Sequence, residues 1–366
     1  MKISLKNTPE QVELIKAIGS KNATVSREAG EAFAAFLGPV VQQVLQQAAT
    51  ANQIFTDAPF DEDDSPSYPL DLYYQTGANH VQVWSQSVAG GLPSSQVTGM
   101  QELKIATYRL DSAVSFGKTY ARKARLDIIS KAIERMAQEI LVKQERNAWA
   151  VVLKALAEGS TNSVKHAFGS ASAADFTLAL LSDLMTRSKR INESWAGGTP
   201  SASSSNGMTD LYVSPEVKGN IRSFAFNAVT NSNTDLPSGV REEIYRSAGS
   251  QEIFGIVINE LMELGVGKKY NTLFDTLAGS TTYTTFAGAS AATFAATDEL
   301  IVGIDNSKGA FIRPVARQSE TGNTFVAIPD DQYNVSRADK AGFYGSLEEG
   351  RVCIDSRAVV GIILKA

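Results

Sequence analysis

The residues best suited to chemistry lie near the C-terminal end of the chain, where Glu348 and Glu349 precede Cys353, the only cysteine in the sequence. Carboxylates beside a thiol can supply a base and a nucleophile for catalysis. Adjacent residues of a strand point to opposite faces, so the two carboxylates cannot converge on one substrate if this segment is a strand. Cys353 stands among apolar residues, which is typical of an unreactive buried cysteine. We therefore predict no catalytic residue here.

The sequence also contains no convincing motif for a metal site or a phosphate site. His80 and His166 have no second histidine, cysteine or acid at metal-ligand spacing, which argues against a zinc site. The sequence ELGVGKKY lacks the four-residue span of a phosphate-binding loop, and Lys269 stands where a serine or threonine would hold magnesium. One acidic run lacks the central glycine of a calcium loop, and we interpret it as a solvated turn: Asp57, Asp61, Glu62, Asp63 and Asp64. We predict no metal and no cofactor.

The composition is typical of a globular protein, with 43% hydrophobic and 20% charged residues. The net charge of -5 gives no reason to expect nucleic-acid binding by bulk charge. Segment 118–154 carries nine Lys and Arg against four acids, and we interpret it as a solvated helix face, with contact to DNA as a weaker hypothesis. One cysteine excludes a disulfide framework within the chain. Without a signal peptide or a membrane-length apolar run, we expect an intracellular product and no membrane partner.

The element that the sequence predicts most clearly is a long helix over 127–159, with Asp127 as its cap and apolar residues at spacings of three and four. About 30 residues make a rod of roughly 45 Å, which suits a spine across a flat domain better than a compact enzyme. The first 50 residues predict shorter helices, with a break near Gly38 and Pro39. These helices are too short for a core of their own, so we expect them to pack on another part of the protein.

Strands and loops make up most of the remaining prediction. Residues 80–116 favour two strands joined by a long tip rich in glycine, proline and serine. Ser214 and Pro215 predict a strand that leads into a capped helix. Segment 276–297 has no charged residue, so we expect its outer face to be an interface. A further helix is expected at 176–194, and further strands at 252–265, 299–305, 310–316, 324–330 and 339–364.

The order of these parts resembles the major capsid proteins of tailed bacteriophages, with the Hong Kong ninety-seven type of fold. Three stretches carry the resemblance. VWSQSVAGG before LKIATYRLDSAVSFGKTYARKARLD resembles the family's extended loop running into the spine helix. DLYVSPEVKGNIRSF resembles the strand and helix of the axial domain. DKAGFYGSLEEGRVCIDSRAVVGI is similar to the closing segment, in which an aromatic-glycine turn precedes a strand.

The resemblance implies an α+β phage capsid-shell fold with an N-terminal arm, an extended hairpin loop, a long spine helix, and peripheral and axial domains. The segments would be 1–55 for the arm, 56–117 for the extended loop, 118–174 for the peripheral domain with the spine, 175–297 for the axial domain, and 298–366 for the return strands of the peripheral domain and the C-terminus. Arm and loop would reach neighbouring subunits. The protein would be a structural subunit that self-assembles, as homo-pentamers and homo-hexamers, into an icosahedral shell around the viral genome.

The family also implies partners and places. Besides further copies of itself, the subunit would meet a scaffolding protein, a portal and, in some members, a cement protein, and would hold packaged DNA without sequence specificity. It would assemble in the host cytoplasm and end in the virion capsid. Our predicted intersubunit contacts lie on the extended loop, at the entry to the spine and in the closing segment: Trp84, Leu92, Arg122, Arg125, Phe343 and Tyr344.

Two departures limit what the resemblance carries over. Some members cross-link a lysine to an asparagine, but no motif around Lys104 or Lys118 matches that chemistry, and we do not assign it. Some carry a long scaffolding segment before the arm; here the arm starts at Met1, so we expect separate scaffolding. Two alternatives stay open at this point: an encapsulin-like nanocompartment shell, which would hold a cargo protein, and an α+β enzyme of unrecognised type with a pocket of convergent polar groups.

Overall fold

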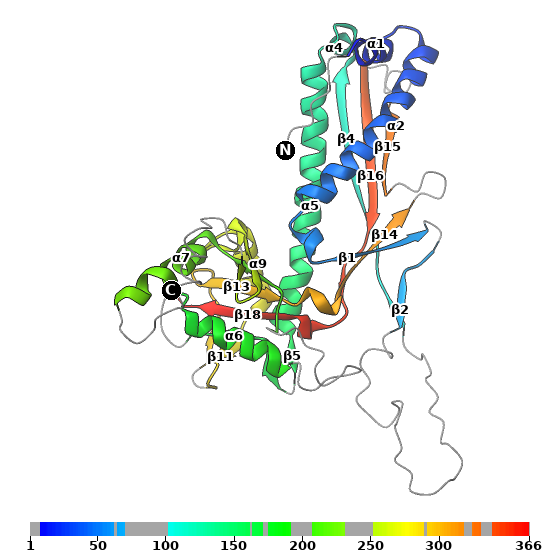
Figure 1. Ribbon diagram of the computed structural model, residues 1–366. Coiled ribbons are helices and arrows are strands. Elements are labelled where there is room, and N and C mark those ends of the chain that lie inside the picture. Colours follow the sequence, from blue (N-terminus) through cyan, green and yellow to red (C-terminus); the bar gives the residue numbers. More distant parts are fainter. Residues whose placement is uncertain are drawn as a thin grey trace, which may run out of the picture. The chain divides into compact units, whose positions relative to one another are not determined.

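The computed structural model describes residues 8–61, 64–69, 102–161, 163–170, 175–191, 207–230, 252–288, 291–317, 324–330 and 339–365. The chain forms two compact units (Figure 1). Unit 1 contains residues 1–66, 104–148 and 312–352, and unit 2 contains residues 67–103, 149–311 and 353–366. Each unit is therefore assembled from segments that are far apart in the sequence.

Unit 1 is built on a sheet in which β16 pairs with three other strands, β14, β15 and β4. The strand order is β1-β14-β16-β15, and β4 pairs with β16 along the whole length of both strands. β1 and β14 run parallel, whereas β15 and β4 are antiparallel to β16. The strands are β1 (Thr56–Asp61), β4 (Tyr108–Gly117), β14 (Phe311–Arg317), β15 (Phe325–Asp330) and β16 (Lys340–Glu349).

Four helices accompany this sheet. They are α1 (Pro9–Ile18), α2 (Ala23–Ala48), α4 (Lys118–Arg122) and the first part of α5 (Leu126–Glu158). α2 lies along β15 (Figure 1). One apolar core joins the four helices to the sheet, and it includes Ile15, Phe33, Ile133, Phe325 and Phe343. The short N-terminal helices thus pack on other elements, as the sequence predicted.

The two glycines of the closing segment lie inside β16, where we expected them to form a turn with the aromatic residues. Gly342 and Gly345 lie inside a continuous strand, so the expected turn is wrong. An added Cβ at Gly345 would lie 2.4 Å from the Phe325 ring, and one at Gly342 would lie 2.6 Å from the Val114 carbonyl oxygen. The missing side chains therefore admit close neighbours, including an aromatic ring on a paired strand.

The break that we predicted near Gly38 and Pro39 is also wrong, because α2 continues through Pro39 for nine more residues, to Ala48. A proline inside a helix loses one backbone hydrogen bond and crowds the preceding turn. α2 compensates through its buried face, on which Phe33, Leu37 and Val41 join the core of unit 1. Tertiary packing outweighs the local preference here.

Pro39 is exposed, so replacing it removes little packing and restores a donor for the carbonyl of the preceding turn. We expect Pro39→Ala to stabilise unit 1 by about 1 kcal/mol or more. Urea unfolding monitored by circular dichroism measures the gain, with Gln43→Ala, at another exposed position of α2, as the control. A loss of stability would show that the helix needs the local geometry that proline imposes.

Unit 2 contains a second six-stranded sheet, in the order β7-β18-β13-β8-β10-β9. β8 and β10 are parallel, and β13 pairs antiparallel with both β8 and β18. The core on this sheet includes Phe168, Leu184, Leu211, Ile301 and Ile362. The strands are β7 (Ala167–Gly169), β8 (Asp210–Val213), β9 (Glu252–Ile253), β10 (Ile256–Glu260), β13 (Glu299–Ile304) and β18 (Val359–Leu364), and the helices are α6 (Leu178–Ile191), α7 (Pro215–Thr230) and α9 (Lys269–Ala278).

Short elements complete the chain. The small strands are β2 (Ser67–Pro69), β3 (Glu102–Lys104), β5 (Ser160–Thr161), β6 (Val164–Lys165), β11 (Thr282–Thr284), β12 (Ala291–Thr293) and β17 (Val352–Cys353), and the 3-10 helices are Ala51–Gln53, Met262–Leu264, Asn306–Lys308 and Ser356–Ala358. Where we expected one strand over 252–265, β9 and β10 form a hairpin, because Phe254 and Gly255 both take positive φ, at 53° and 75°. Such a pair of angles is what a tight hairpin turn needs.

The Ser214 prediction is confirmed: its side-chain oxygen accepts from the Val217 N–H at 3.1 Å and begins α7 after β8. The segment boundaries of the sequence prediction fall differently from those of the two units. Residues 298–311 and 353–366, which we assigned to the peripheral return strands, belong to unit 2, where β13 and β18 pair with each other.

Candidate subunit-contact surfaces

Glu349, the first candidate for chemistry, lies at the centre of a buried ionic cluster in unit 1. Its side chain is fully buried at the end of β16. Arg313 Nε donates to Glu349 Oε2 at 2.7 Å, Gln144 Nε2 donates to the same oxygen at 3.1 Å, and Tyr108 Oη donates to Oε1 at 3.0 Å. Arg351 Nη2 also donates to Oε2, at 3.4 Å. With both its oxygens bound by protein donors, this carboxylate holds elements together and is not free to act as a base.

The charges of this cluster explain its titration. Burial by itself would raise the pKa of Glu349, but the guanidinium groups of Arg313 and Arg351 and the hydrogen bonds lower that pKa overall. Burial, followed by the charge of Glu349, raises the pKa of Tyr108 to about 12. Arg313 also donates to Asp57 Oδ1 at 3.3 Å, and Arg351 stacks on the Phe55 ring at 4.9 Å. The cluster therefore joins β1, β4, β14, β16 and α5.

Glu348 points elsewhere, as strand geometry requires. It accepts from Thr107 Oγ1 at 2.6 Å, whereas Glu349 is bound by Arg313, Gln144, Tyr108 and Arg351. The prediction that the two carboxylates do not converge is confirmed. Sequence reasoning missed the partners of Glu349, because Gln144 and Arg313 are 205 and 36 residues away along the chain. Only the neighbouring Arg351 carried a local signal.

Cys353 is a free, partly buried cysteine in β17. Burial, reinforced by the charge of Asp355, raises the pKa of its thiol to about 12 from the usual 9.0. At pH 8 the thiolate fraction then falls from about one in ten to about one in ten thousand. We expect iodoacetamide to label native Cys353 about 1,000-fold more slowly than the urea-unfolded chain, measured by mass spectrometry. Labelling within tenfold of the unfolded rate would show that the thiol is open to solvent.

His166 is a buried residue of unit 2, and Thr161 Oγ1 lies 2.9 Å from its Nε2. Burial lowers its pKa to about 4, so the ring is neutral at pH 7.

Among the described residues, no group of three or more histidine, cysteine, aspartate or glutamate side chains is arranged to hold a metal ion. Nor does any described helix combine the length and apolarity needed to span a membrane.

The two predicted contact residues of the closing segment lie on opposite faces of β16. Phe343 is 2% exposed and packs between Phe33, at 5.1 Å between ring centroids, and Phe116, at 6.0 Å. It belongs to the core of unit 1, so its side chain does not face outward. Tyr344 instead accepts a hydrogen bond from Arg109 Nη2 at 3.0 Å and lies under that guanidinium. Its role as a contact stays a prediction.

The other predicted contacts divide in a similar way. Arg122 donates to the Gly19 carbonyl at 2.6 Å and to Asp339 at 3.2 Å, so it already ties α4 to the end of α1. Arg125 is exposed between α4 and α5, just after Ala124, whose φ of 50° lets the chain turn. Trp84 and Leu92 lie outside the described residues. None of these four contact predictions is tested.

The basic stretch over 118–154 is partly internal. Lys118 is 4% exposed and donates to Ser26 Oγ at 3.4 Å inside unit 1. Other cations of the stretch are exposed along α5 and before it: Lys123, Arg125, Lys131, Arg135, Lys143, Arg146 and Lys154. The interpretation as a largely solvated helix face therefore agrees with the structure, and contact with DNA stays a hypothesis.

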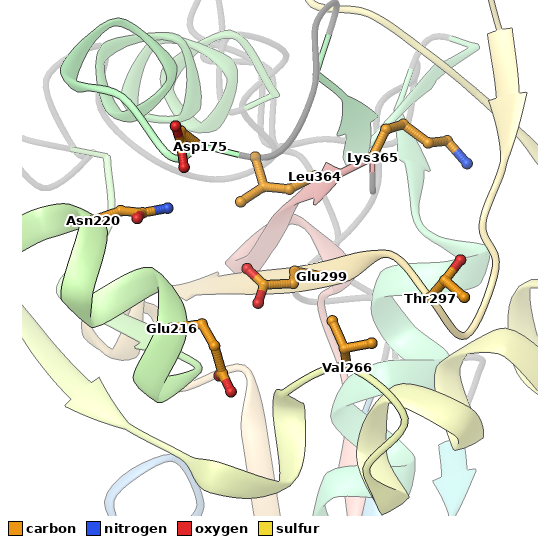
Figure 2. Close-up of a pocket in the computed structure, with 8 residues that line it drawn as sticks. All are labelled: Asp175, Glu216, Asn220, Val266, Thr297, Glu299, Leu364 and Lys365. Carbon is orange, nitrogen blue, oxygen red and sulfur yellow. The ribbon is translucent and has the colours of Figure 1, made fainter.

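A pocket of about 270 Å³ opens in unit 2 (Figure 2). Asp175, before α6, Glu216, in the first turn of α7, and Glu299, at the start of β13, line it together with Asn220, Val266, Thr297, Leu364 and Lys365. Lys365 directs its ammonium away from these acids and pairs with Asp298 at 2.6 Å. Burial, and then the charges of Glu216 and Asp175, raise the pKa of Glu299. No local pattern predicted this acidic pocket, because its three acids come from distant segments.

Together, the features described so far define a class of fold: one unit in which a long helix accompanies a sheet, and a second unit of mixed sheet and helices, each assembled from separate segments of the chain. This is the arrangement that the resemblance to capsid-shell proteins implies. The described residues that line the pocket include neither histidine nor cysteine.

Comparisons with solved structures agree with this class. The capsid of an empty GTA particle matches with a TM-score of 0.50 at 11% identity, over 87% of this chain and 90% of that chain. The capsid of cyanophage P-SCSP1u gives 0.49 at 15% identity over 87% and 88%, and the mature capsid of bacteriophage PhiM1 gives 0.47 at 11% over 87% of each. No protein-family model and no curated protein matches the sequence. The first match carries the assignment: the chain has the α+β fold of that capsid protein, as predicted.

Proposed function

We propose that this protein is the subunit of an icosahedral capsid shell of a tailed phage, assembled as pentamers and hexamers around the viral genome. One observation carries the proposal: the capsid-protein fold extends over 87% of the chain. A fold that covers nearly the whole chain leaves little room for a separate catalytic domain. The role is therefore structural and not enzymatic.

The side chains that first suggested catalysis, those of Glu349 and Cys353, also support a structural role. Glu349 is bound to four donors, and burial raises the pKa of Cys353 to about 12. Buried charged networks of this kind can fix one arrangement of a fold, which suits a subunit that must be identical at every lattice position. Exposed apolar side chains such as Phe36, Ile328 and Met262 provide candidate contact area between subunits.

The proposal extends to partners and place. Further copies of the chain are the main partner, a scaffolding protein guides curvature, a portal occupies one vertex, and a cement protein is an optional addition. Packaged DNA touches the inner surface through phosphates, without sequence specificity. Assembly takes place in the host cytoplasm, and the final location is the virion capsid.

Electron microscopy of the purified protein tests the proposal, with the absorbance ratio at 260 and 280 nm recorded on the same fraction. We expect closed icosahedral shells, with nucleic acid inside those from infected cells. Shells that hold a cargo protein and no genome would identify a compartment instead of a virus. A monomer or dimer that never assembles, even with the scaffolding protein supplied, would contradict the proposal.

A further inference from the structure

A basic cluster at the end of α6 contains a buried arginine that has no carboxylate partner among the residues that the structure describes. Arg187 is 7% exposed, and its Nε has no hydrogen-bond partner in the described part of the chain. Its guanidinium lies over Phe168 at 5.3 Å and over Phe286 at 5.5 Å. A buried cation without an anion is costly, so a partner that arrives later would relieve that cost.

A second cation makes the cluster more strongly positive. Arg190 lies over the same Phe286 ring at 5.1 Å and is exposed to solvent. Burial, followed by the charge of Arg190, lowers the pKa of Arg187, and no carboxylate is among the causes. The two guanidinium groups, with an aromatic floor between them, form a site for an anionic side chain.

The acidic pocket of unit 2 carries the opposite charge, and its carboxylates have no neutralising cation among the described lining residues. Asp175, Glu216 and Glu299 line one pocket (Figure 2), and the charges of Glu216 and Asp175 add to burial in raising the pKa of Glu299. The one cation among the lining residues, Lys365, is paired with Asp298. An arginine from outside would neutralise carboxylates that no described cation of the pocket neutralises.

The two surfaces lie toward opposite ends of one helix. Asp175 precedes α6 by three residues, whereas Arg187 and Arg190 are in its last turns. Fourteen helical residues span about 21 Å, so one subunit cannot bring the two surfaces together. A head-to-tail contact between neighbouring copies pairs these opposite charges, and it forms a ring when the rotation between neighbours closes.

We propose that the basic cluster of one subunit, Arg187 and Arg190, docks on the acidic pocket of the next, Asp175, Glu216 and Glu299, around each pentamer and hexamer. This inference rests on the proposed shell function and specifies one of its contacts. The occupant is a second copy of this chain, because that copy carries the matching charges.

Charge exchange tests the contact at the two exposed positions. Arg190→Glu and Glu216→Lys should each reduce the yield of closed shells at least about tenfold, because each places like charges across every contact. The double variant Arg190→Glu/Glu216→Lys should restore the yield to within about twofold, since it exchanges the two signs. Lys154→Glu, with the same charge change at a side chain 60% exposed, should assemble normally.

A mixture of the two single variants gives the sharpest result. Subunits that alternate around a ring satisfy every contact, and alternation closes in a ring of six but not of five. We therefore expect hexameric sheets or tubes and few closed shells. A mixture that behaves like either variant alone, or single variants that assemble like wild type, would overturn the inference.

Folding and function are separated by two further measurements. Arg187→Met keeps an unbranched side chain between the two rings, and we expect a folded chain by hydrogen exchange with a several-fold lower shell yield. Unchanged yield would show that Arg187 has only a packing role, and would count against the contact. If wild-type protein does not assemble with scaffolding, the shell function itself fails; if it assembles and the variants do too, only this contact fails.

Discussion

Replacing Glu349 by glutamine should destabilise unit 1 by about 3–5 kcal/mol, because it leaves Arg313 and Arg351 buried without their common counter-ion. Urea unfolding of the unassembled chain measures the loss, and hydrogen exchange should localise it to β4 and β16. Glu348→Gln, at the next residue, is the matched control, since an amide oxygen can still accept from Thr107. Equal effects of the two substitutions would contradict a special role of the buried cluster.

The same variant predicts a dependence on pH. The folded-state pKa of Glu349 is lowered from 4.5, so its contribution to stability is present above the unfolded-state pKa and is lost as the pH falls through the folded-state value. Glutamine does not titrate. The stability difference between wild type and Glu349→Gln should therefore be constant from pH 6 to 8 and shrink below about pH 4.5. A constant difference down to pH 2 would show that ionisation of Glu349 is not what stabilises unit 1.

Truncating Phe343 should cost about 3–5 kcal/mol, because its ring fills the core between Phe33 and Phe116. Tyr344→Ala, at the next residue of β16, should hardly move the urea midpoint, since that ring lies against Arg109 on the other face. The pair separates a core role from a contact role. If Tyr344 contacts a neighbouring subunit, Tyr344→Ala lowers the shell yield while the chain stays folded. A stable Phe343→Ala would mean that the core can collapse around the gap.

The local sequence pattern was enough to predict some helices and strands correctly, but not others. The periodic apolar residues between Ile129 and Leu156 predicted α5 to within two residues of its ends, and Ser214 predicted the start of α7. Local rules failed where distant contacts decide. α2 continues through Pro39 because its apolar face is buried on a sheet that no local window contains.

Some features of the candidate site residues could likewise be predicted from local pattern, and others could not. Strand alternation predicted that the side chains of Glu348 and Glu349 would point to opposite faces of the strand. Apolar surroundings predicted an inert Cys353. Neither the partners of Glu349 nor the acidic pocket could be predicted, since their members are brought together only by the folded sheet order. Phe343 was predicted as a subunit contact in the closing segment. Alternation along β16 places its side chain in the core of unit 1, and its role in a contact stays a prediction.

The pairing of β4 with β16 also determines when the subunit can fold during synthesis. β16 emerges from the ribosome more than 200 residues after its partner, and β18, which unit 2 needs, emerges later still. Until then the apolar faces of α2 and α5 lack the strands that cover them. Nascent chains must therefore stay unfinished and aggregation-prone for many seconds at ordinary translation rates of about 5–20 residues per second. Each of the two sheets pairs strands from distant parts of the chain, so neither sheet is complete until its late strands have been synthesised.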